Sequence, residues 1–223
     1  EINEKFEKKE IEFNNNNYIK IDELGVGNSH VQLVCHIELE QLFALKLFHG
    51  IEGQFLSERE KRNYTRIHHP LIPKYYGTIT VDKKEHLLIE YIKGSSLDLI
   101  EELHLNESEK ISIIFEIMKI IEYLHNNKFI YRDLKPNNFI IDENKTIVLI
   151  DFDRMLTIKE EQNTNDFSSI YVAPEVNETE EFSYEVDIYS LGLLFYFIIM
   201  EKDPPSIKDK KKLFNQFPED FYY

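Results

Sequence analysis

The sequence has one cysteine, no tryptophan and too few basic residues to balance its acids. Cys35 alone excludes an internal disulfide and any zinc site built from several cysteines, so we expect it to be a small buried residue. With 26 Lys and Arg against 41 Asp and Glu, the net charge is −15. This charge disfavours nucleic acid or an anionic membrane surface as the main partner.

Long hydrophobic runs are also missing, and the first residues do not show the pattern of a secretory leader. The most apolar stretch, residues 188–200, is shorter than the roughly 20 residues that a membrane-spanning helix needs, so it predicts a buried core helix. Residues 1–12 alternate acids and lysines around isolated apolar residues, a pattern unlike a signal peptide. We therefore expect no membrane span and an intracellular, cytoplasmic location, although a sequence that starts with Glu1 leaves a cropped N-terminus open.

Apolar residues are nevertheless frequent enough for a core. They make up 42% of 223 residues, which suits one large domain or two lobes. Residues 1–17 form a polar lead-in. Alternating apolar and polar residues over 18–48 and 74–92 predict antiparallel strands, with a helical pattern between them over 53–68. The sequence therefore predicts a mostly β first lobe, residues 18–92.

Helical periodicity dominates the second half. Residues 106–126 carry apolar side chains at helical spacing, namely Ile111, Ile114, Ile117, Ile121 and Leu124. Asn106 with Glu109 forms a plausible N-terminal cap. Residues 183–200 form a second helical pattern that is apolar nearly all round, so we expect it to be covered on most sides. These patterns predict a mainly helical second lobe, residues 93–223.

Three motifs follow one another in this second half: Tyr131-Arg132-Asp133-Leu134-Lys135-Pro136-Asn137-Asn138, Asp151-Phe152-Asp153 and Ala173-Pro174-Glu175. In order and spacing they resemble the H-R-D-L-x-x-x-N, D-F-G and A-P-E motifs of eukaryotic protein kinases. Two positions depart from the family pattern, with Tyr131 in place of His and Asp153 in place of Gly. The resemblance runs from about Tyr18 to the C-terminus.

The resemblance implies an α+β, bilobal protein-kinase-like fold. Its N-lobe would be a small antiparallel β-sheet with one helix, and its C-lobe would be mainly helical. Because the family's helical lobe usually continues through several more helices, residues 93–223 would be an incomplete C-lobe.

The family's catalytic residues have counterparts here. By resemblance, Asp133 accepts the proton of the substrate hydroxyl and Lys135 contacts the γ-phosphate of ATP. Asn138 and Asp151 are the expected ligands of Mg²⁺, a hard cation that prefers oxygen. Single Asp and Asn residues are common in turns, but the complete set at this spacing favours the catalytic interpretation. Asp153 would add a carboxylate near the metal, so Mn²⁺ is a second candidate cation.

A lysine and a glutamate upstream resemble the family's nucleotide-binding ion pair. Lys46, in Ala44-Leu45-Lys46, corresponds to the strand lysine that holds the α- and β-phosphates. Glu60 would be its partner, although Ser57 and Glu60 also fit a capping box.

The remaining nucleotide contacts follow from the resemblance too. Gly25 and Gly27 stand where the glycine-rich phosphate loop belongs, and the third glycine is either replaced by His30 or deleted. The deletion would place Val31 over the adenine. The other expected adenine contacts are Ala44, Ile140, Glu90 and Ile92.

The acceptor is expected to be a protein Ser or Thr hydroxyl. The Lys135-Pro136 pair after Asp133 has the form found in Ser/Thr-specific members, and Ser168 occupies the position of a Thr that contacts the catalytic Asp and Lys in them. Four acids follow the A-P-E match and form an acidic cluster: Glu178, Glu180, Glu181 and Glu185. Such a cluster is usually only a solvated face. If it lies near the peptide groove, it would favour basic substrates.

Two other functions compete with an active Ser/Thr kinase. The altered glycine loop and Asp153 suggest a pseudokinase that binds nucleotide or acts as a scaffold with little or no phosphate transfer. The second rival is a small-molecule kinase of similar fold. Such enzymes generally lack the A-P-E segment and the helix signature that begins at Asp187 here, so this rival is the weaker one.

Overall fold

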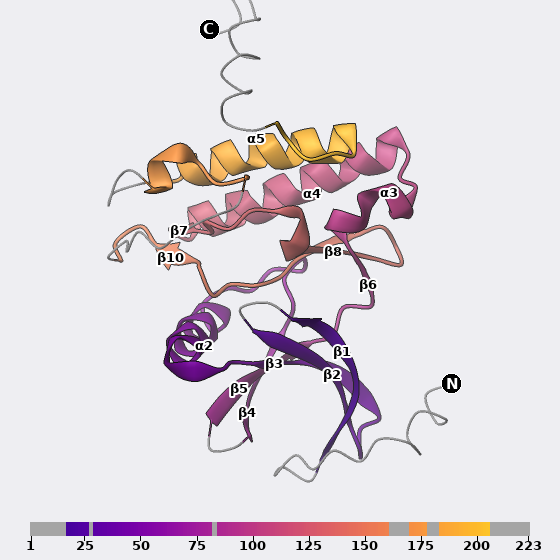
Figure 1. The fold of residues 1–223 in the computed structure, drawn as a ribbon, viewed down its shortest axis with the longest axis vertical. Helices are drawn as coiled ribbons and strands as arrows, with labels where there is room; N and C mark the ends of the chain where they lie inside the picture. The colour runs from indigo at the N-terminus through magenta and orange to yellow at the C-terminus, as the bar shows by residue number, and fades with distance from the viewer. Residues whose placement is uncertain (1–16, 27–28, 82–83, 161–169, 178–182, 206–223) are drawn as a thin grey trace, which may run out of the picture. The chain divides into compact units, whose positions relative to one another are not determined.

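The computed structural model describes residues 17–26, 29–81, 84–160, 170–177 and 183–205 (Figure 1). The chain divides into two compact units. The first unit comprises Glu1–Ser95 and Ile140–Met155, and the second comprises Ser96–Phe139 and Leu156–Tyr223. The lobe boundary between residues 92 and 93 stays a prediction. The structure groups residues 140–155, which follow that boundary in sequence, with the first unit.

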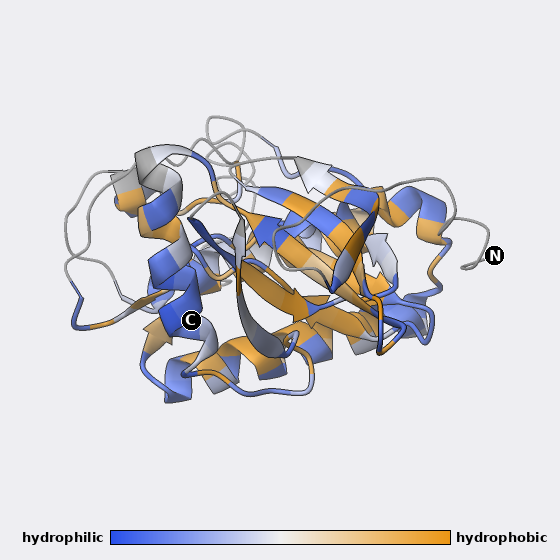
Figure 2. Cartoon of the chain, turned by 90° about the horizontal axis from the view of Figure 1, so that it is seen from below, coloured by the Kyte–Doolittle hydropathy of each residue, from blue (hydrophilic) through white to orange (hydrophobic). Residues whose placement is uncertain are grey.

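A five-stranded antiparallel sheet, in the order β1-β2-β3-β5-β4, forms most of the first unit. Its strands confirm the alternating patterns: β1 (Tyr18–Val26), β2 (His30–His36), β3 (Gln41–Leu47), β4 (Tyr75–Val81) and β5 (Lys84–Glu90). Figure 2 shows hydrophobic residues along these strands. One cluster of the sheet's core consists of Val34, Phe43, Leu45, Leu47, Ile79 and Leu88. Cys35 is a buried free thiol in β2, as expected.

Helix α2 (Gly50–Tyr64) is the one helix described in the first unit and it follows β3 directly. The sequence placed this helix at 53–68, so it begins and ends earlier than predicted. The α-helical pattern stops after Tyr64: Thr65 N still donates to Lys61 O, four residues back, whereas Arg66 N donates to Asn63 O, only three residues back. The proline at position 70, used as the stop signal, lies in the following loop.

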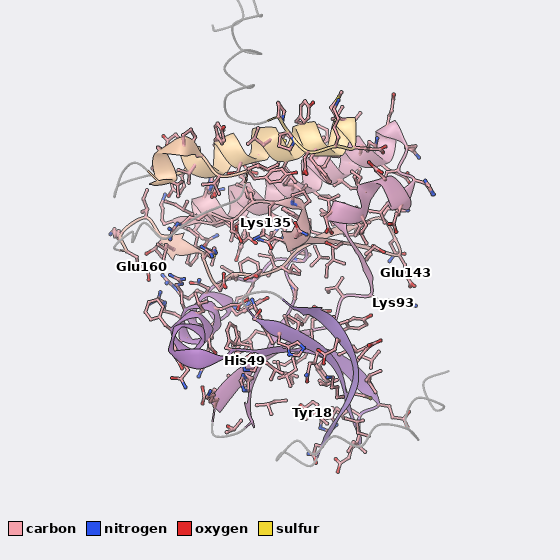
Figure 3. The ribbon with its side chains drawn as sticks, viewed as in Figure 1. Tyr18, His49, Lys93, Lys135, Glu143 and Glu160 are labelled. Atoms are coloured by element: carbon pink, nitrogen blue, oxygen red, sulfur yellow. The ribbon has the colours of Figure 1, made fainter. Side chains whose placement is uncertain are left out.

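A second, small sheet has the order β6-β8-β9. Its strands are β6 (Gly94–Ser96), β8 (Phe139–Asp142) and β9 (Ile147–Leu149). The turn between β8 and β9 is closed by Asp142, whose Oδ1 accepts hydrogen bonds from Asn144 N at 2.8 Å and Thr146 N at 2.9 Å. Lys93 lies beside this sheet and forms an exposed ion pair of 2.7 Å with Glu143 (Figure 3).

The second unit is mainly helical. Its long helices are α4 (Glu107–Asn126) and α5 (Glu185–Met200), which confirm the two helical patterns. Its shorter elements are η1 (Leu97–Leu99), α3 (Ile100–Leu103), β7 (Phe129–Ile130), η2 (Pro136–Asn138), β10 (Leu156–Thr157) and η3 (Pro174–Asn177). Among the described residues, no helix is both long and apolar enough to cross a membrane.

Helix α4 begins at the predicted cap. Glu109 N donates to Asn106 Oδ1 at 3.0 Å and Asn106 N donates to Glu109 Oε2 at 2.8 Å, which is a reciprocal capping box. Its buried face consists of Ile113, Ile117, Ile120, Ile121 and Leu124. Ile111, which the periodicity counted among the apolar face, is 49% exposed.

The start of α5 packs on the segment that contains the A-P-E motif. Val186 of α5 shares a core cluster with Ile130 of β7 and with Val172, Ala173 and Val176. Further along α5, Ile188 is exposed, so the helix is less covered than its composition predicted.

Gly94 and Gly192 make a matched pair for substitution by alanine. A Cβ atom on Gly94 would lie 2.8 Å from Ile140 Cγ2 and would also meet the backbone of Ile141, whereas a Cβ atom on Gly192 in α5 would meet no atom within 4 Å. We expect Gly94→Ala to lower the free energy of unfolding by about 1–3 kcal/mol through overpacking. Gly192→Ala should raise it by roughly 0.5–1 kcal/mol, because alanine favours a helix interior. Urea unfolding of both variants would measure this, and equal effects would contradict the expected backbone clash.

Candidate functional site

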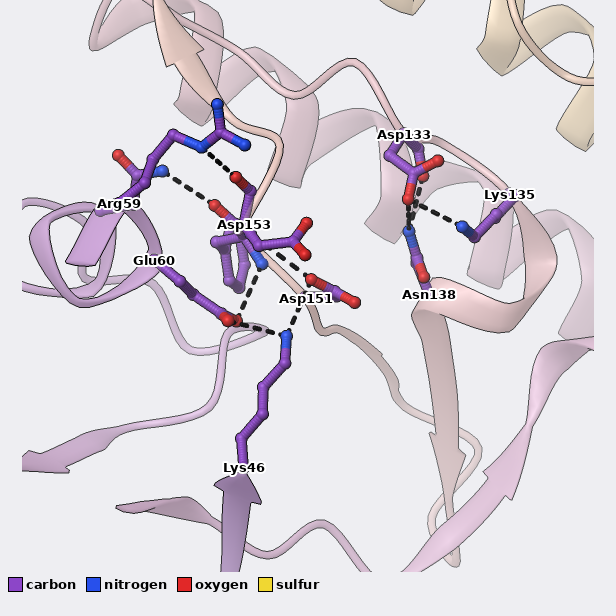
Figure 4. A network of polar contacts seen from close by, with 10 residues as sticks. Lys46, Arg59, Glu60, Asp133, Lys135, Asn138, Asp151 and Asp153 are labelled. Carbon is purple, nitrogen blue, oxygen red and sulfur yellow. Dashed lines mark hydrogen bonds and ion pairs between the residues drawn. The ribbon is translucent and has the colours of Figure 1, made fainter. Parts of the chain in front are cut away.

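Lys46, Glu60 and Asp151 meet inside the first unit. Strand β3 carries Lys46 as a buried residue, 3% exposed, and α2 carries Glu60, which is 0% exposed. Lys46 Nζ lies 2.7 Å from Glu60 Oε2 and 2.9 Å from Asp151 Oδ1 (Figure 4). The expected Lys46–Glu60 ion pair is therefore present. Ser57 lies within α2, whose N-cap is His49, so the competing capping box is absent.

The positive and negative charges of this cluster stabilise each other's charged forms. Burial disfavours the charged form of Lys46, but the carboxylates of Asp151 and Glu60 raise the pKa of the lysine well above its usual range. Burial also acts against ionised Asp151, but the Lys46 ammonium lowers the pKa of that carboxyl below its usual value. Lys46 therefore stays a cation and Asp151 an anion at neutral pH. Both forms are the ones that phosphate and metal binding require.

Asp153, at the position of the family's glycine, is a buried acid, only 3% exposed. Burial, together with the neighbouring charge of Asp151, raises the pKa of Asp153 to about 8. At neutral pH its side chain is therefore largely a neutral carboxylic acid. The left-handed backbone conformation in this turn belongs to Asp151, with φ 67°, and Asp153 N donates to Asp151 Oδ1 at 3.4 Å.

Asp153→Asn, which mimics the neutral acid, should stabilise the metal-free protein at neutral pH. Because the pKa of Asp153 is about 8 in the folded chain and about 4 in an unfolded one, only the unfolded chain is ionised between those values. Asp153 therefore lowers stability increasingly as the pH rises from about 4 to about 8. We expect the substitution to raise the free energy of unfolding by roughly 1–4 kcal/mol at about pH 7.

The gain should vanish below about pH 3, where the side chain is protonated in both the folded and the unfolded state. Urea unfolding with a chelator at several pH values would measure it. A gain of the same size at all pH values would contradict the raised pKa of Asp153.

The residues expected to contact the nucleotide all belong to the first unit, as far as it is described. Gly25 in β1 pairs with Val31 in β2, and Val31 pairs with Lys46 in β3. Ala44, which is buried, pairs with Ile89 in β5. The other expected contacts are Glu90 at the end of β5, Ile92 just after it and Ile140 in β8. Gly27 lies outside the described residues.

The end of β5 is anchored by two hydrogen bonds. Glu90 N donates to Lys74 O at 2.8 Å, and Lys74 N donates to Glu90 Oε2 at 3.0 Å. The amide hydrogen of Glu90 is thus used within the protein. Its carbonyl oxygen and the backbone of Ile92 remain the candidate partners for a nucleotide base.

A second polar cluster lies within the second unit and consists of Asp133, Lys135 and Asn138. Lys135 Nζ lies 2.8 Å from Asp133 Oδ2 (Figure 4). Asn138 Nδ2 donates to Asp133 O at 2.7 Å and to Asp133 Oδ2 at 3.0 Å. Pro136 begins η2, which turns the chain so that Asn138 faces back to Asp133. The structure therefore brings these three motif residues together.

Each cluster contains an oxygen donor that suits a divalent cation. Asn138 uses its amide nitrogen on Asp133, which leaves its carbonyl oxygen as the group that could bind a metal. Asp151 offers a carboxylate that is ionised at neutral pH, because its pKa is lowered. Amide and carboxylate oxygens are the ligands that Mg²⁺ prefers. The chemistry of these two residues therefore fits the expected metal.

Asp187 supports the second cluster in a way that sequence reasoning missed. This carboxylate is 0% exposed at the start of α5. Its Oδ2 accepts a hydrogen bond from Tyr131 N and lies 2.8 Å from His125 Nε2, while its Oδ1 accepts one from Arg132 N. Arg132 has a left-handed φ of 74°. The sequence did offer one signal for this role: Asp187 is an acid in a helix that is apolar nearly all round, and a buried charge needs hydrogen-bond partners.

Two features of the predicted substrate site fall outside the described part of the chain. These are Ser168 and the acidic residues Glu178, Glu180 and Glu181. The fourth acid of that cluster, Glu185, is exposed in the first turn of α5. The preference for a hydroxyl and for basic substrates stays a prediction.

Known proteins resemble this chain over most of its length. The family described as "Protein kinase domain" matches residues 18–221. The Aurora kinase of Eremothecium gossypii is 31% identical over 202 residues, which cover 85% of this chain and 54% of that protein. The SNF1-like protein kinase ssp2 of Schizosaccharomyces pombe is 32% identical over 200 residues, which cover 84% of this chain and 34% of that protein.

A human protein is similar to the chain over a comparable length. The serine/threonine-protein kinase DCLK3 is 27% identical over 204 residues, which cover 86% of this chain and 32% of that protein. The chain thus spans between about a third and about half the length of these relatives. Because the family match covers more than half of the chain, the chain belongs to the protein kinase domain family.

Proposed function

We propose that this domain is a protein kinase that transfers the γ-phosphate of Mg-ATP to Ser or Thr hydroxyls of protein substrates. The observation that carries the proposal is that both polar clusters are complete. Lys46, Glu60 and Asp151 form one connected network, and Asp133 is bonded to Lys135 and Asn138 in the other. Phosphate transfer depends mainly on positioning and charge neutralisation, which such networks can supply.

The first cluster would bind the nucleotide. Lys46 would hold the α- and β-phosphates, and Glu60 would fix the position of its ammonium group. Val31, Ala44 and Ile140 would cover the adenine, while the backbone of Glu90 and Ile92 would bond to its edge. Gly25 and Gly27 would let the chain approach the phosphates closely.

The second cluster would act on the acceptor hydroxyl. Asp133 would accept its proton as the hydroxyl oxygen forms a bond to the γ-phosphorus and the bond to the β,γ-bridging oxygen breaks, which leaves ADP. Lys135 would neutralise charge on the transferred phosphoryl group. A magnesium or manganese ion held by Asn138 and Asp151 would neutralise phosphate charge.

Ser and Thr are the proposed acceptors for two reasons. Lys135 follows Asp133 by two residues, in the Ser/Thr form of the catalytic loop. One of the relatives carries serine/threonine specificity in its name. We also propose that the protein substrates are basic around the acceptor, since the chain carries a net charge of −15 and charge complementarity steers association.

A pseudokinase is the alternative that specific observations favour. The glycine loop lacks one glycine, and Asp153 replaces another. If these changes prevented productive binding of Mg-ATP, the domain would bind partners without transferring phosphate. The retained Lys46, Asp133 and Asp151 weigh against this alternative, because the proposed chemistry requires each of them.

A transfer assay with separate measurement of nucleotide binding tests the proposal. The protein would be incubated with ATP and either Mg²⁺ or Mn²⁺, together with basic peptides that differ only in a Ser, Thr or Tyr acceptor. Mass spectrometry of the peptides should find phosphate on Ser or Thr. Phosphate on Tyr alone would contradict the specificity. Binding of ATP without transfer under either metal would favour the pseudokinase.

A further inference from the structure

Besides Glu60, two other residues of helix α2 form hydrogen bonds to the turn that carries Asp151. We call residues 151–155 the Asp151 turn. Glu60 Oε1 accepts a hydrogen bond from Phe152 N at 3.1 Å. One helical turn further along α2, Asn63 Nδ2 donates to Phe152 O at 2.8 Å and to Met155 O at 2.8 Å. Arg59 Nε donates to Asp153 O.

Asn63 is suited to this contact by its amide group. It is 0% exposed, and two carbonyl oxygens can be satisfied at once only by a group with two donor hydrogens. Its own Oδ1 has no hydrogen-bond partner in the part of the chain that the structure describes. An apolar side chain of the same size would avoid that unfavourable burial, so the donor hydrogens are what asparagine contributes here.

The Asp151 turn needs an external support. Asp151 adopts φ 67°, a left-handed conformation that is unfavourable for residues other than glycine and persists when the surroundings hold it. The ion pair with Lys46 holds only the side chain of Asp151. The bonds from Asn63 and Arg59 hold the backbone on its C-terminal side.

We infer that Asn63 is a positioning residue for the reaction: by donating to the carbonyl oxygens of Phe152 and Met155, it fixes the Asp151 turn to α2. The inference rests on the proposed function, in which Asp151 binds the metal. Glu60 joins the same helix to Lys46, so α2 sets the positions of the lysine and of Asp151 together. Arg59, which is partly exposed, adds a further hydrogen bond to the same turn.

Hydrogen exchange in the nucleotide-free protein tests this inference without using activity. Asn63→Leu keeps the approximate size of the side chain and removes both donors. The amides of Phe152 and Met155 should then exchange about tenfold faster or more, as expected for the loss of two buried hydrogen bonds. The amides of α4 should be unaffected. The matched control is Asn127→Leu, which removes the bond from Asn127 Nδ2 to Tyr123 O at 2.8 Å in the second unit and should leave the Asp151 turn unchanged.

Kinetics then separate positioning from simple loss of stability. We expect kcat per folded molecule to fall about tenfold to a hundredfold, the range that a displacement of about 1 Å can produce. The KM for ATP should change little, because Asn63 does not contact the nucleotide in the proposal. Unchanged exchange in the Asp151 turn, or unchanged kcat with only a lower melting temperature, would overturn the inference.

A second variant covers the case in which Asn63→Leu does not fold. Arg59→Gln removes the bond to Asp153 O from a partly exposed position, and it should speed exchange in the same turn by a smaller factor. No change in this variant would then count against the support by α2. If the wild-type protein transfers no phosphate, the proposed function fails, while the exchange data still decide whether α2 holds the turn.

Discussion

Asp133→Asn should lower the rate of phosphate transfer by at least about a hundredfold while the protein still binds ATP. General-base catalysis contributes about 10²–10⁴-fold, and asparagine cannot accept the proton. The substitution keeps the shape of the side chain. Its amide oxygen can still accept the hydrogen bonds that Lys135 Nζ and Asn138 Nδ2 make to Asp133 Oδ2, so the loop should stay folded.

Initial rates of peptide phosphorylation, with ATP affinity measured by calorimetry, would give this result. Asp98→Asn is the matched control, because Asp98 is an exposed acid of η1 whose Oδ2 accepts a bond from Asn137 Nδ2 at 2.7 Å. It should transfer phosphate at the wild-type rate. An Asp133→Asn protein as active as this control would show that Asp133 is not the base.

Asp187→Ala should have the largest effect on stability. The substitution leaves the buried amides of Tyr131 and Arg132 without the acceptors that Asp187 provides. Each unsatisfied buried group costs about 1–3 kcal/mol, so we expect the free energy of unfolding to fall by roughly 3–5 kcal/mol. Because Asp133 directly follows these amides in the chain, transfer should also slow in the molecules that remain folded.

Glu185→Ala serves as the control for this second prediction. Glu185 carries the same charge in the same first turn of α5, but its side chain is exposed. Its loss should change stability by no more than about 0.5–1 kcal/mol. Chemical unfolding followed by circular dichroism compares the two variants. Equal losses would mean that Asp187 acts only through the charge of the helix terminus.

Local signals in the sequence were sufficient for the elements and for the grouping of the motif residues. The capping box at Asn106 needs only residues within one turn, and the structure contains it as predicted. The Lys46–Glu60 pair joins separate elements, but the family resemblance pointed to it before the structure did. The ends of α2 were less predictable, because they depend on hydrogen bonds that compete locally after Tyr64.

Contacts between distant, chemically ordinary residues were beyond sequence reasoning. Asn63 looks like any polar helix residue until its burial and its bond to Met155, 92 positions later, are known. The neutral state of Asp153 follows from its burial in the folded chain, which the amino-acid sequence around it does not indicate. Ile111 shows the opposite error, since periodicity alone assigned it to the apolar face and it is 49% exposed.

The single buried thiol of the chain makes the first sheet observable on its own. Cys35 is 0% exposed in β2, and burial raises the pKa of its thiol, so an alkylating reagent can reach a reactive thiolate only when the sheet opens. The rate of alkylation therefore reports the opening of the first unit. Gly94→Ala should speed it directly. Asp187→Ala should speed it only if the two units unfold cooperatively, so one reagent measures the coupling between them.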